Sequence, residues 1–204
     1  MLIDCQGYDP DKLYFLLIQT VIPRPIAWVL SDNGNDTYNL APFSFFNALT
    51  SEPPLVMICA GWKSEEHRKD TWVNIDKRQD FVIHIPSEEH GPNVAASAAP
   101  LAHGESEIHQ LKLKLEPVEG MRLPRVVGPK AVFFCAKHAI YEIGAGPQAL
   151  IIGEIKKIWL DDAILEQKDN RLTVHYDVFN PLARLGGNFY TLLGKQLTIK
   201  RGER

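Results

Sequence analysis

The residues most suited to chemistry stand near position 69. Lys69 supplies a positive charge directly before Asp70 and Thr71, and Trp72 and Ile75 follow with the spacing of one helix face. This pattern predicts a helix of about ten residues that begins near Asp70, with Asp70 or Thr71 as its N-cap. The free backbone N–H groups of a helix start, a lysine and a hydroxyl together suit a phosphate group. A plain capped helix with a solvated lysine explains the same residues, so this stretch alone leaves both interpretations open.

A second candidate site lies in residues 23–54, where large apolar side chains are mixed with prolines and small polar residues. The hydrogen-bonding side chains include Asn39, Ser44, Asn47, Thr50 and Ser51, and the flat apolar ones are Phe43, Phe45 and Phe46. A tricyclic flavin needs this mixture, because its ring has apolar faces and a polar pyrimidine edge. Two half-buried strands joined by turns would produce a similar pattern.

The other motifs argue against several common kinds of site. The sequence GAGPQA at 144–149 partly matches a dinucleotide-binding loop, but the residues after it read as a strand instead of the required helix, so a hairpin is the better interpretation. None of the seven histidines forms a helical pair for a metal, and we expect no metal site. The G-x-S-x-G motif of many hydrolases is absent and no acid–base pair stands out, so we predict no catalytic side chain.

The composition is typical of a globular protein and indicates neither a nucleic-acid nor a membrane partner. The chain has 204 residues, of which 45% are hydrophobic and 23% charged, and we expect one domain over residues 1–204. The formal net charge of -3 gives no general attraction to nucleic acid or to anionic membranes. Cys5, Cys59 and Cys135 are widely scattered, and neither a signal sequence nor a membrane-length apolar run is present, so we expect a cytoplasmic protein.

The elements that must position these residues are mostly strands. The predicted strands cover residues 24–31, 54–61, 80–86, 130–144 and 149–163. Pro25 places the first of them at a sheet edge or at a strand start, the second and third read as fully buried, and GAGP joins the last two in a hairpin. Short helices are expected within 93–112. Because the helices do not alternate regularly with the strands, we predict a mainly β fold with helical decorations, in the form of a β-barrel.

The order of the motifs resembles that of the flavin reductase-like family, the FMN-binding split barrels. The motifs are PRPIAWV (23–29), NLAPFSFF (39–46), PPLVMI (53–58), KDTWVNI (69–75) and PLARLGGNFY (181–190). The resemblance covers residues 13–192, nearly the whole chain. It implies an FMN-binding split β-barrel that forms a homodimer, with FMN near the subunit interface.

The resemblance also implies which residues bind FMN. Lys69 and Thr71 would contact the FMN phosphate, Asp70 would fix the loop, and Arg24 would lie near the phosphate or the ribityl chain. The remaining contacts would be Asn39, Ala41, Pro42, Ser44 and Phe45 along the flavin, Asn47 and Thr50 by the ring or ribityl chain, and Arg184 and Tyr190 in the tail that closes the site. The loop before Lys69 is longer and more charged than a minimal phosphate loop, so Ser64, His67 and Arg68 could contact phosphate, contact NAD(P)H or face water.

The activity that the resemblance implies is hydride transfer from NAD(P)H to flavin, often to supply a partner monooxygenase. The protein would act by positioning nicotinamide against flavin, which agrees with the lack of a predicted nucleophile or general base. Two alternatives stay open. One is an FMN-binding electron carrier of the flavoredoxin type without direct NAD(P)H turnover, and the other is a β-barrel that has lost the flavin and binds a partner.

Overall fold

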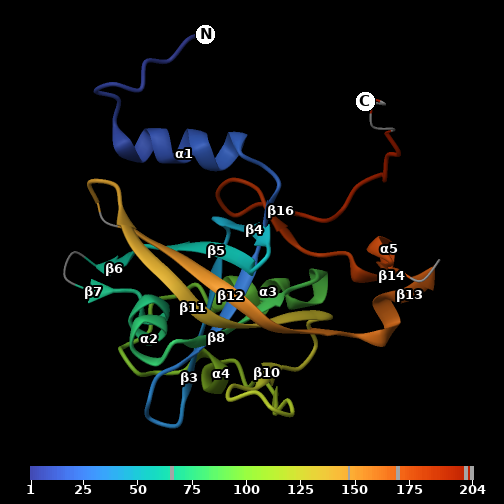
Figure 1. Ribbon diagram of the computed structural model, residues 1–204. Helices are drawn as coiled ribbons and strands as arrows, with labels where there is room; N and C mark the ends of the chain where they lie inside the picture. Colours follow the sequence, from blue (N-terminus) through green and yellow to red (C-terminus); the bar gives the residue numbers. More distant parts are fainter. Residues whose placement is uncertain (65–66, 147, 169–170, 200–201, 203–204) are drawn as a thin grey trace.

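A seven-stranded antiparallel sheet forms the centre of the computed structural model, which describes residues 1–64, 67–146, 148–168, 171–199 and 202. Its strands follow the order β3-β2-β8-β11-β12-β5-β4. Their bounds are β2 Ala27–Asp32, β3 Tyr38–Phe43, β4 Phe46–Ser51, β5 Pro54–Ala60, β8 Asp80–Ile85, β11 Ala131–Ile143 and β12 Gln148–Leu160. The mainly β class predicted from the sequence is confirmed (Figure 1).

Small sheets and short helices surround the large sheet. The small sheets are β1 Arg24–Pro25 with β15 Ala183–Arg184 and β16 Tyr190–Thr191; β6 Trp62–Ser64 with β7 His67–Arg68; β9 Leu115–Glu116 with β10 Arg125–Val126; and β13 Leu165–Lys168 with β14 Arg171–Val174. The helices are α1 Pro10–Thr20, α2 Asp70–Arg78, η1 Glu88–His90, α3 Gly91–Ala96, α4 Glu107–Gln110, η2 Asp162–Ile164 and α5 Tyr176–Phe179. Figure 1 shows α1 apart from the other helices, at the end of the molecule where both termini lie.

Buried side chains cover both faces of the sheet. In β2, Val29 belongs to one buried cluster together with Ile83 of β8, whereas Trp28 and Leu30 belong to a second cluster together with Val82. Successive residues of a strand point to opposite faces, so these neighbours in sequence necessarily enter different clusters. The core therefore extends on both sides of β2 and β8, which explains why both strands are almost entirely buried.

Two strand predictions need correction. Residues 27–32 form an interior strand between β3 and β8, and Pro25 lies just before it, in the short β1 at the edge of a separate sheet. Pro25 is the last residue of β1 and β2 begins two residues later, so the proline leaves β2 free to pair on both sides, and the prediction of an edge or strand start is wrong for residues 27–32. Strand β5 is not fully buried: Val56 and Ile58 lie in the core, whereas Cys59 on the opposite face is only partly covered.

The hairpin predicted at GAGP is confirmed. Strands β11 and β12 pair antiparallel up to Ile143 and Gln148, and Pro147 lies outside the described residues. The two strands form the long ribbon that crosses Figure 1. In the part of the chain that the structure describes, no helix has both the length and the apolar character needed to cross a membrane.

Candidate functional site

A cavity of about 970 Å³ lies between the sheet and the small sheet β1-β15-β16. Its wall comprises Tyr14, Ile26, Pro42, Phe43, Ser44, Phe45, Cys59, Gly61, Trp62, Ser64, Lys69, Val94, Ala98, Gly146, Gln148, Arg184 and Tyr190. Six of the thirteen residues predicted to bind a cofactor are among them: Pro42, Ser44, Phe45, Lys69, Arg184 and Tyr190. The volume falls within the range of pockets that hold cofactors and other small ligands.

Lys69 brings a positive charge into this cavity at the start of α2. Its ammonium lies 5.5 Å from the centre of the Phe43 ring, and burial lowers the pKa of Lys69. No carboxylate of the described residues lies within 4.0 Å of it. The backbone N–H groups of Asp70 and Thr71 likewise have no acceptor among these residues. A lysine and two N–H groups without a described acceptor, together at a helix start, form an arrangement that can hold a phosphate.

The N-cap of α2 is Lys69, so the prediction that Asp70 or Thr71 caps the helix is wrong. The Asp70 carboxylate accepts a hydrogen bond of 2.8 Å from Lys63 Nζ and contacts the ring of His103 through its other oxygen. The Thr71 hydroxyl accepts a bond of 2.8 Å from Asn39 Nδ2. Both side chains are bound elsewhere and cannot turn back to the first N–H groups.

Asn39 and Thr71 lie behind the cavity wall. They are 4% and 1% exposed, and their hydrogen bond joins β3 to α2. Asn74 extends the same network by donating to Ser31 Oγ at 3.2 Å and to Asn33 Oδ1 at 2.9 Å. These polar groups therefore fix where α2 begins, and with it where Lys69 enters the cavity.

The end of β3 and its connection to β4 supply the aromatic part of the wall. Pro42 and Phe43 are the last residues of β3, and Ser44 and Phe45 form the connection. Ala41 is half-buried and packs against the core beneath them. The wall thus offers flat apolar surface with the Ser44 hydroxyl between Phe43 and Phe45, whereas the other hydrogen-bonding residues predicted within 23–54 and Phe46 do not border the cavity.

Asn47 and Thr50 lie outside this wall, on the exposed edge strand β4. Asn47 Oδ1 accepts a hydrogen bond of 2.9 Å from the backbone of Ala48, and Thr50 Oγ1 donates one of 2.5 Å to the carbonyl of Pro53. Both side chains support the local backbone of the edge strand.

Two arginines meet where β1 pairs with β15. Arg24 and Arg184 stand opposite each other in the register of the two strands. Arg24 is 6% exposed and donates to the carbonyls of Ile18, Val21 and Leu185 at 2.6, 2.6 and 2.7 Å. Its pKa is lowered by burial first and by the charge of Arg184 second. Arg184 itself faces the cavity, 4.6 Å from the centre of the Tyr190 ring.

The residues of the charged segment before α2 have different roles. Ser64 borders the cavity, and its hydroxyl lies 3.1 Å from Nδ1 of His67. Arg68 is held by Glu142 of β11 at 2.6 Å and lies 4.2 Å from the centre of the Trp72 ring. Arg68 therefore braces the long hairpin against α2, and Ser64 is the one of the three predicted residues that lines the cavity.

Several wall residues were missed from the sequence. Tyr14 of α1, Val94 of α3 and Gln148 of β12 reach the cavity from distant segments that carry no motif. Trp62 is a different case, because an aromatic residue next to Gly61 in a charged loop is a signal that sequence reasoning could have used. In the described ranges, no group of three metal-ligating side chains occurs.

The family model that matches the chain is described as "Flavin reductase like domain" and covers residues 19–192. The protein YwrF of Bacillus subtilis is 33% identical over 194 residues, which are 92% of each chain. The family model and this relative both extend over nearly all of the segment that carries the motifs.

Solved structures resemble the chain over almost its whole length. Nitrilotriacetate monooxygenase component B from Bacillus cereus has a TM-score of 0.91 at 29% identity and covers 98% of both chains. The 2-nitrobenzoate 2-nitroreductase NbaA from Pseudomonas fluorescens has a TM-score of 0.87 at 26% identity, with 99% of this chain and 96% of that one covered. A putative flavin reductase with a split barrel domain from Shewanella frigidimarina has a TM-score of 0.82 at 16% identity, covers 99% of this chain and 100% of that one, and confirms the split-barrel fold.

Proposed function

This chain belongs to the flavin reductase-like family, and from that membership we propose that it is an FMN-binding oxidoreductase that transfers hydride from NAD(P)H to flavin. The observation that carries the proposal is the position of Lys69. A half-buried ammonium lines a cavity of about 970 Å³, beside two backbone N–H groups that have no acceptor in the described part of the chain. This arrangement fits the phosphate of a mononucleotide, because a charge-assisted contact and a helix start act on the same group.

With the phosphate at Lys69, the other predicted residues can be assigned to the flavin ring or to the support of α2. Pro42, Ser44 and Phe45 would line the flavin ring together with Phe43, and Arg184 and Tyr190 would close the site. Asn39, Asp70 and Thr71 would act by holding α2 in place, with Thr71 adding its backbone N–H to the phosphate. The other four predicted contacts, Arg24, Ala41, Asn47 and Thr50, do not border this cavity, and we propose them only as supports of the backbone around it.

Bound flavin would supply the hydride-accepting atom, and the chain's own groups would orient the two reactants. The aromatic wall presents flat surface to a ring, and Lys69, 5.5 Å from the centre of the Phe43 ring, would hold the phosphate at the start of α2. We assign no nucleophile and no general base, since positioning alone brings two planar reactants to the short distance that a hydride needs.

We also propose a homodimer in the cytoplasm that passes electrons to another protein or small acceptor. The name of the Bacillus cereus neighbour, a monooxygenase component B, supports a monooxygenase as one such acceptor. The exposed apolar side chains of α1 support a dimer, and they include Tyr14, which also reaches the cavity.

The test of the proposal combines binding with turnover. Purified protein is titrated with FMN by fluorescence quenching, and the loaded protein is mixed with NADH or NADPH under nitrogen. We expect FMN binding and bleaching of the flavin spectrum by at least one coenzyme. Binding with a reversible redox signal but no coenzyme oxidation would favour the electron carrier instead.

The variant Lys69→Gln provides the residue-level test. Loss of one charge-assisted contact should weaken FMN binding at least about tenfold. Lys77→Gln, at the exposed end of the same helix, is the matched control and should bind FMN normally. Equal affinities for the two variants would show that the phosphate sits elsewhere.

A further inference from the structure

We infer that Arg184 recognises the carboxylate of a small planar organic acid, bound in the same cavity as the flavin. The inference rests on the proposed function and names the class of second ligand that the site takes. Arg184 lines the cavity from β15, while Lys69 lines it from the start of α2. Figure 1 shows α2 and β16, the strand that pairs with Arg184, at separate places around the sheet.

Two arginines without a described carboxylate partner, Arg24 and Arg184, lie side by side at this wall, and only Arg184 borders the cavity. Arg24 is buried and donates to three carbonyl groups and, at 3.4 Å, to Ser44 Oγ, so its charge meets no carboxylate in the described part of the chain. Arg184 stands beside it. Two like charges side by side repel each other, and because Arg24 is buried behind the wall, an anion bound at Arg184 would offset this repulsion.

The Arg184 guanidinium has no hydrogen-bond or ion-pair partner among the described residues. None of the described residues accepts a hydrogen bond from it, and no described carboxylate lies within 4.0 Å. The side chain is nevertheless half-buried and rests on the Tyr190 ring at 4.6 Å. A guanidinium offers donors in a planar fork that matches a carboxylate, so this group is held in place with its donors available to a ligand.

Aromatic side chains line the cavity that the Arg184 donors face. The rings of Tyr14, Phe45 and Tyr190 line the same cavity. Aromatic walls favour a ligand with a flat body, because ring faces stack or meet edge to face. A planar acid would place its ring among these side chains and its carboxylate on Arg184.

The cavity is large enough for a second ligand besides a mononucleotide. Ligand pockets range from about 300 to about 1,000 Å³, and this cavity is near the top of that range. A mononucleotide that reaches from Lys69 along the aromatic wall would therefore leave room for a second small ring. Both anions would enter one cavity, each with its own cation.

Benzoate is a suitable probe, and benzamide is its neutral isostere. Each is titrated into FMN-loaded protein by calorimetry, and the flavin spectrum is recorded in parallel. We expect benzoate to bind and perturb the spectrum, and benzamide to bind at least about tenfold more weakly. Arg184→Gln should lose at least about tenfold in benzoate affinity, and Arg184→Lys should fall between the two because it keeps the charge without the fork.

Arg171→Gln is the matched control, since it removes one positive charge from an exposed strand outside the cavity wall. Its benzoate affinity should equal that of the unaltered protein. Circular dichroism confirms that the variants fold, and the benzoate–benzamide comparison on unaltered protein stands whatever the variants do.

Equal affinity for benzoate and benzamide, or no effect of Arg184→Gln, would overturn the inference. Benzoate binding that occurs only without FMN would also overturn it, because the flavin itself would then occupy Arg184. The preceding FMN titration separates the two claims: protein that fails to bind FMN defeats the proposed function, whereas protein that binds FMN and not benzoate defeats only this inference.

Discussion

His84 ties the stability of the chain to pH. His84 belongs to β8, and its ring is fully buried between Trp28 of β2 and Val126 of β10. Nδ1 lies 3.0 Å from the carbonyl of Trp28, and Nε2 accepts a hydrogen bond of 2.9 Å from the backbone N–H of Val126. These two partners require a neutral ring with its proton on Nδ1. Burial, followed by the charge of Arg125 among the lowering causes, lowers the pKa of His84 to about 4.

The consequence is a loss of stability in mild acid. The unfolded histidine takes up its proton near its ordinary pKa of 6.5, whereas the folded ring resists protonation until about pH 4. The contribution of His84 is therefore complete above pH 6.5 and declines as the pH falls toward 4, by about 3 kcal/mol in the free energy of unfolding. Urea unfolding at a series of pH values measures this.

His84→Gln separates this histidine from the other titrating groups. The variant is less stable at neutral pH, but its stability should fall less between pH 6.5 and 4 than that of the unaltered protein. His109→Gln, at an exposed position, should keep the original pH dependence. Parallel pH profiles for the unaltered protein and His84→Gln would contradict the assignment.

At the scale of elements, a polar network decides where α2 begins. Asn39 of β3 donates to the Thr71 hydroxyl, and both side chains are almost completely buried. Asn39→Ala would leave a buried hydroxyl without its donor and should lower the free energy of unfolding by about 1–3 kcal/mol. It should also weaken FMN binding, because Lys69 immediately precedes the helix. Gln110→Ala, at the exposed end of α4, is the control and should change neither quantity.

The same helix shows what the sequence could and could not predict. Trp72 and Ile75 are three apart and both are buried, so periodicity located the helix correctly. The cap was wrong because the partners of Asp70 and Thr71 come from elsewhere in the chain: His103 lies 33 residues away and Asn39 lies 32 away. Local patterns cannot contain such pairings.

The cavity wall was likewise predictable where it is continuous in sequence and unpredictable where distant segments meet. The wall segment from Pro42 to Phe45 is continuous in sequence, so its mixture of aromatic and polar residues was visible as a pattern. Tyr14 and Val94 reach the cavity from other helices and look like ordinary apolar residues in their own segments. The roles of Arg24 and Arg184 needed the pairing of β1 with β15, which joins residues 160 positions apart.

At the scale of the whole molecule, apolar side chains remain uncovered on α1. Tyr14, Phe15 and Leu17 are 49%, 54% and 47% exposed. The edge strand β4 adds exposed Leu49. Such apolar surface is usual at protein interfaces, and it supports the proposed homodimer.

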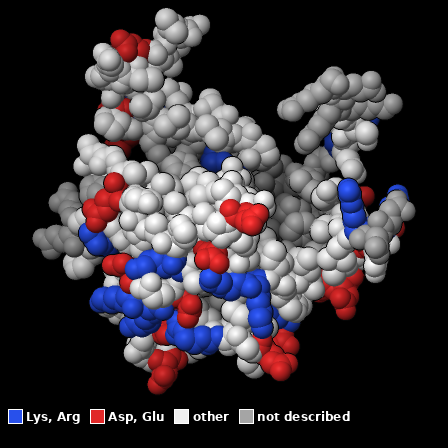
Figure 2. All heavy atoms as spheres, in the orientation of Figure 1, with Lys and Arg blue, Asp and Glu red and all other residues white. Residues whose placement is uncertain are grey.

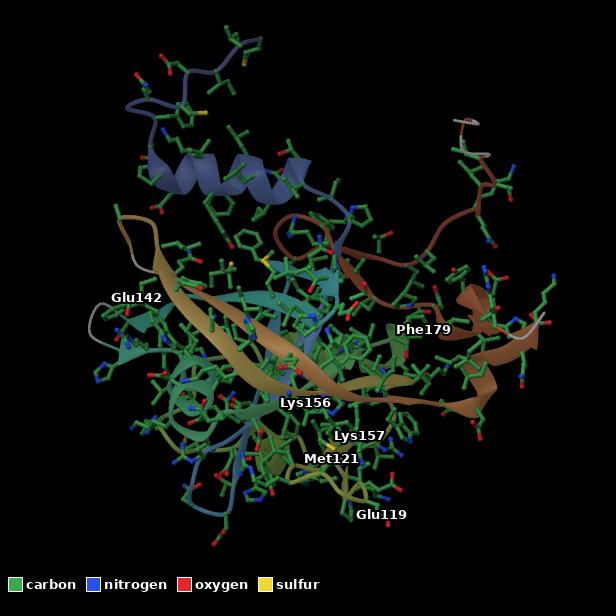
Figure 3. All side chains as sticks on the ribbon, viewed as in Figure 1. Glu119, Met121, Glu142, Lys156, Lys157 and Phe179 are labelled. Carbon is green, nitrogen blue, oxygen red and sulfur yellow. The ribbon has the colours of Figure 1, made fainter. Side chains whose placement is uncertain are left out.

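A different face of the molecule carries mixed charge. Figure 2 shows Lys and Arg gathered on the lower half of this face and interleaved with Asp and Glu. Lys156 and Lys157, labelled in Figure 3, belong to β12 and lie away from α1.

The homodimer can be tested with one charge on α1. Phe15→Glu should convert a dimer into a monomer in sedimentation equilibrium, because a buried unpaired carboxylate is costly. Leu172→Glu on β14 places the same charge on another exposed apolar position, which is 64% exposed, and should remain dimeric. An unaltered protein that is monomeric at all concentrations would refute the dimer outright.

Strand β5 leaves Cys59 on the cavity wall, and this gives the protein a built-in chemical reporter. Burial raises the pKa of the Cys59 thiol, which slows its reaction with alkylating reagents at neutral pH. Cys5 is exposed and Cys135 is buried. Alkylation should therefore be fast at Cys5, dependent on cavity occupancy at Cys59, and very slow at Cys135. Peptide mass mapping after brief alkylation would therefore read cavity occupancy at the middle position against two internal standards, with no spectroscopic signal from the ligand required.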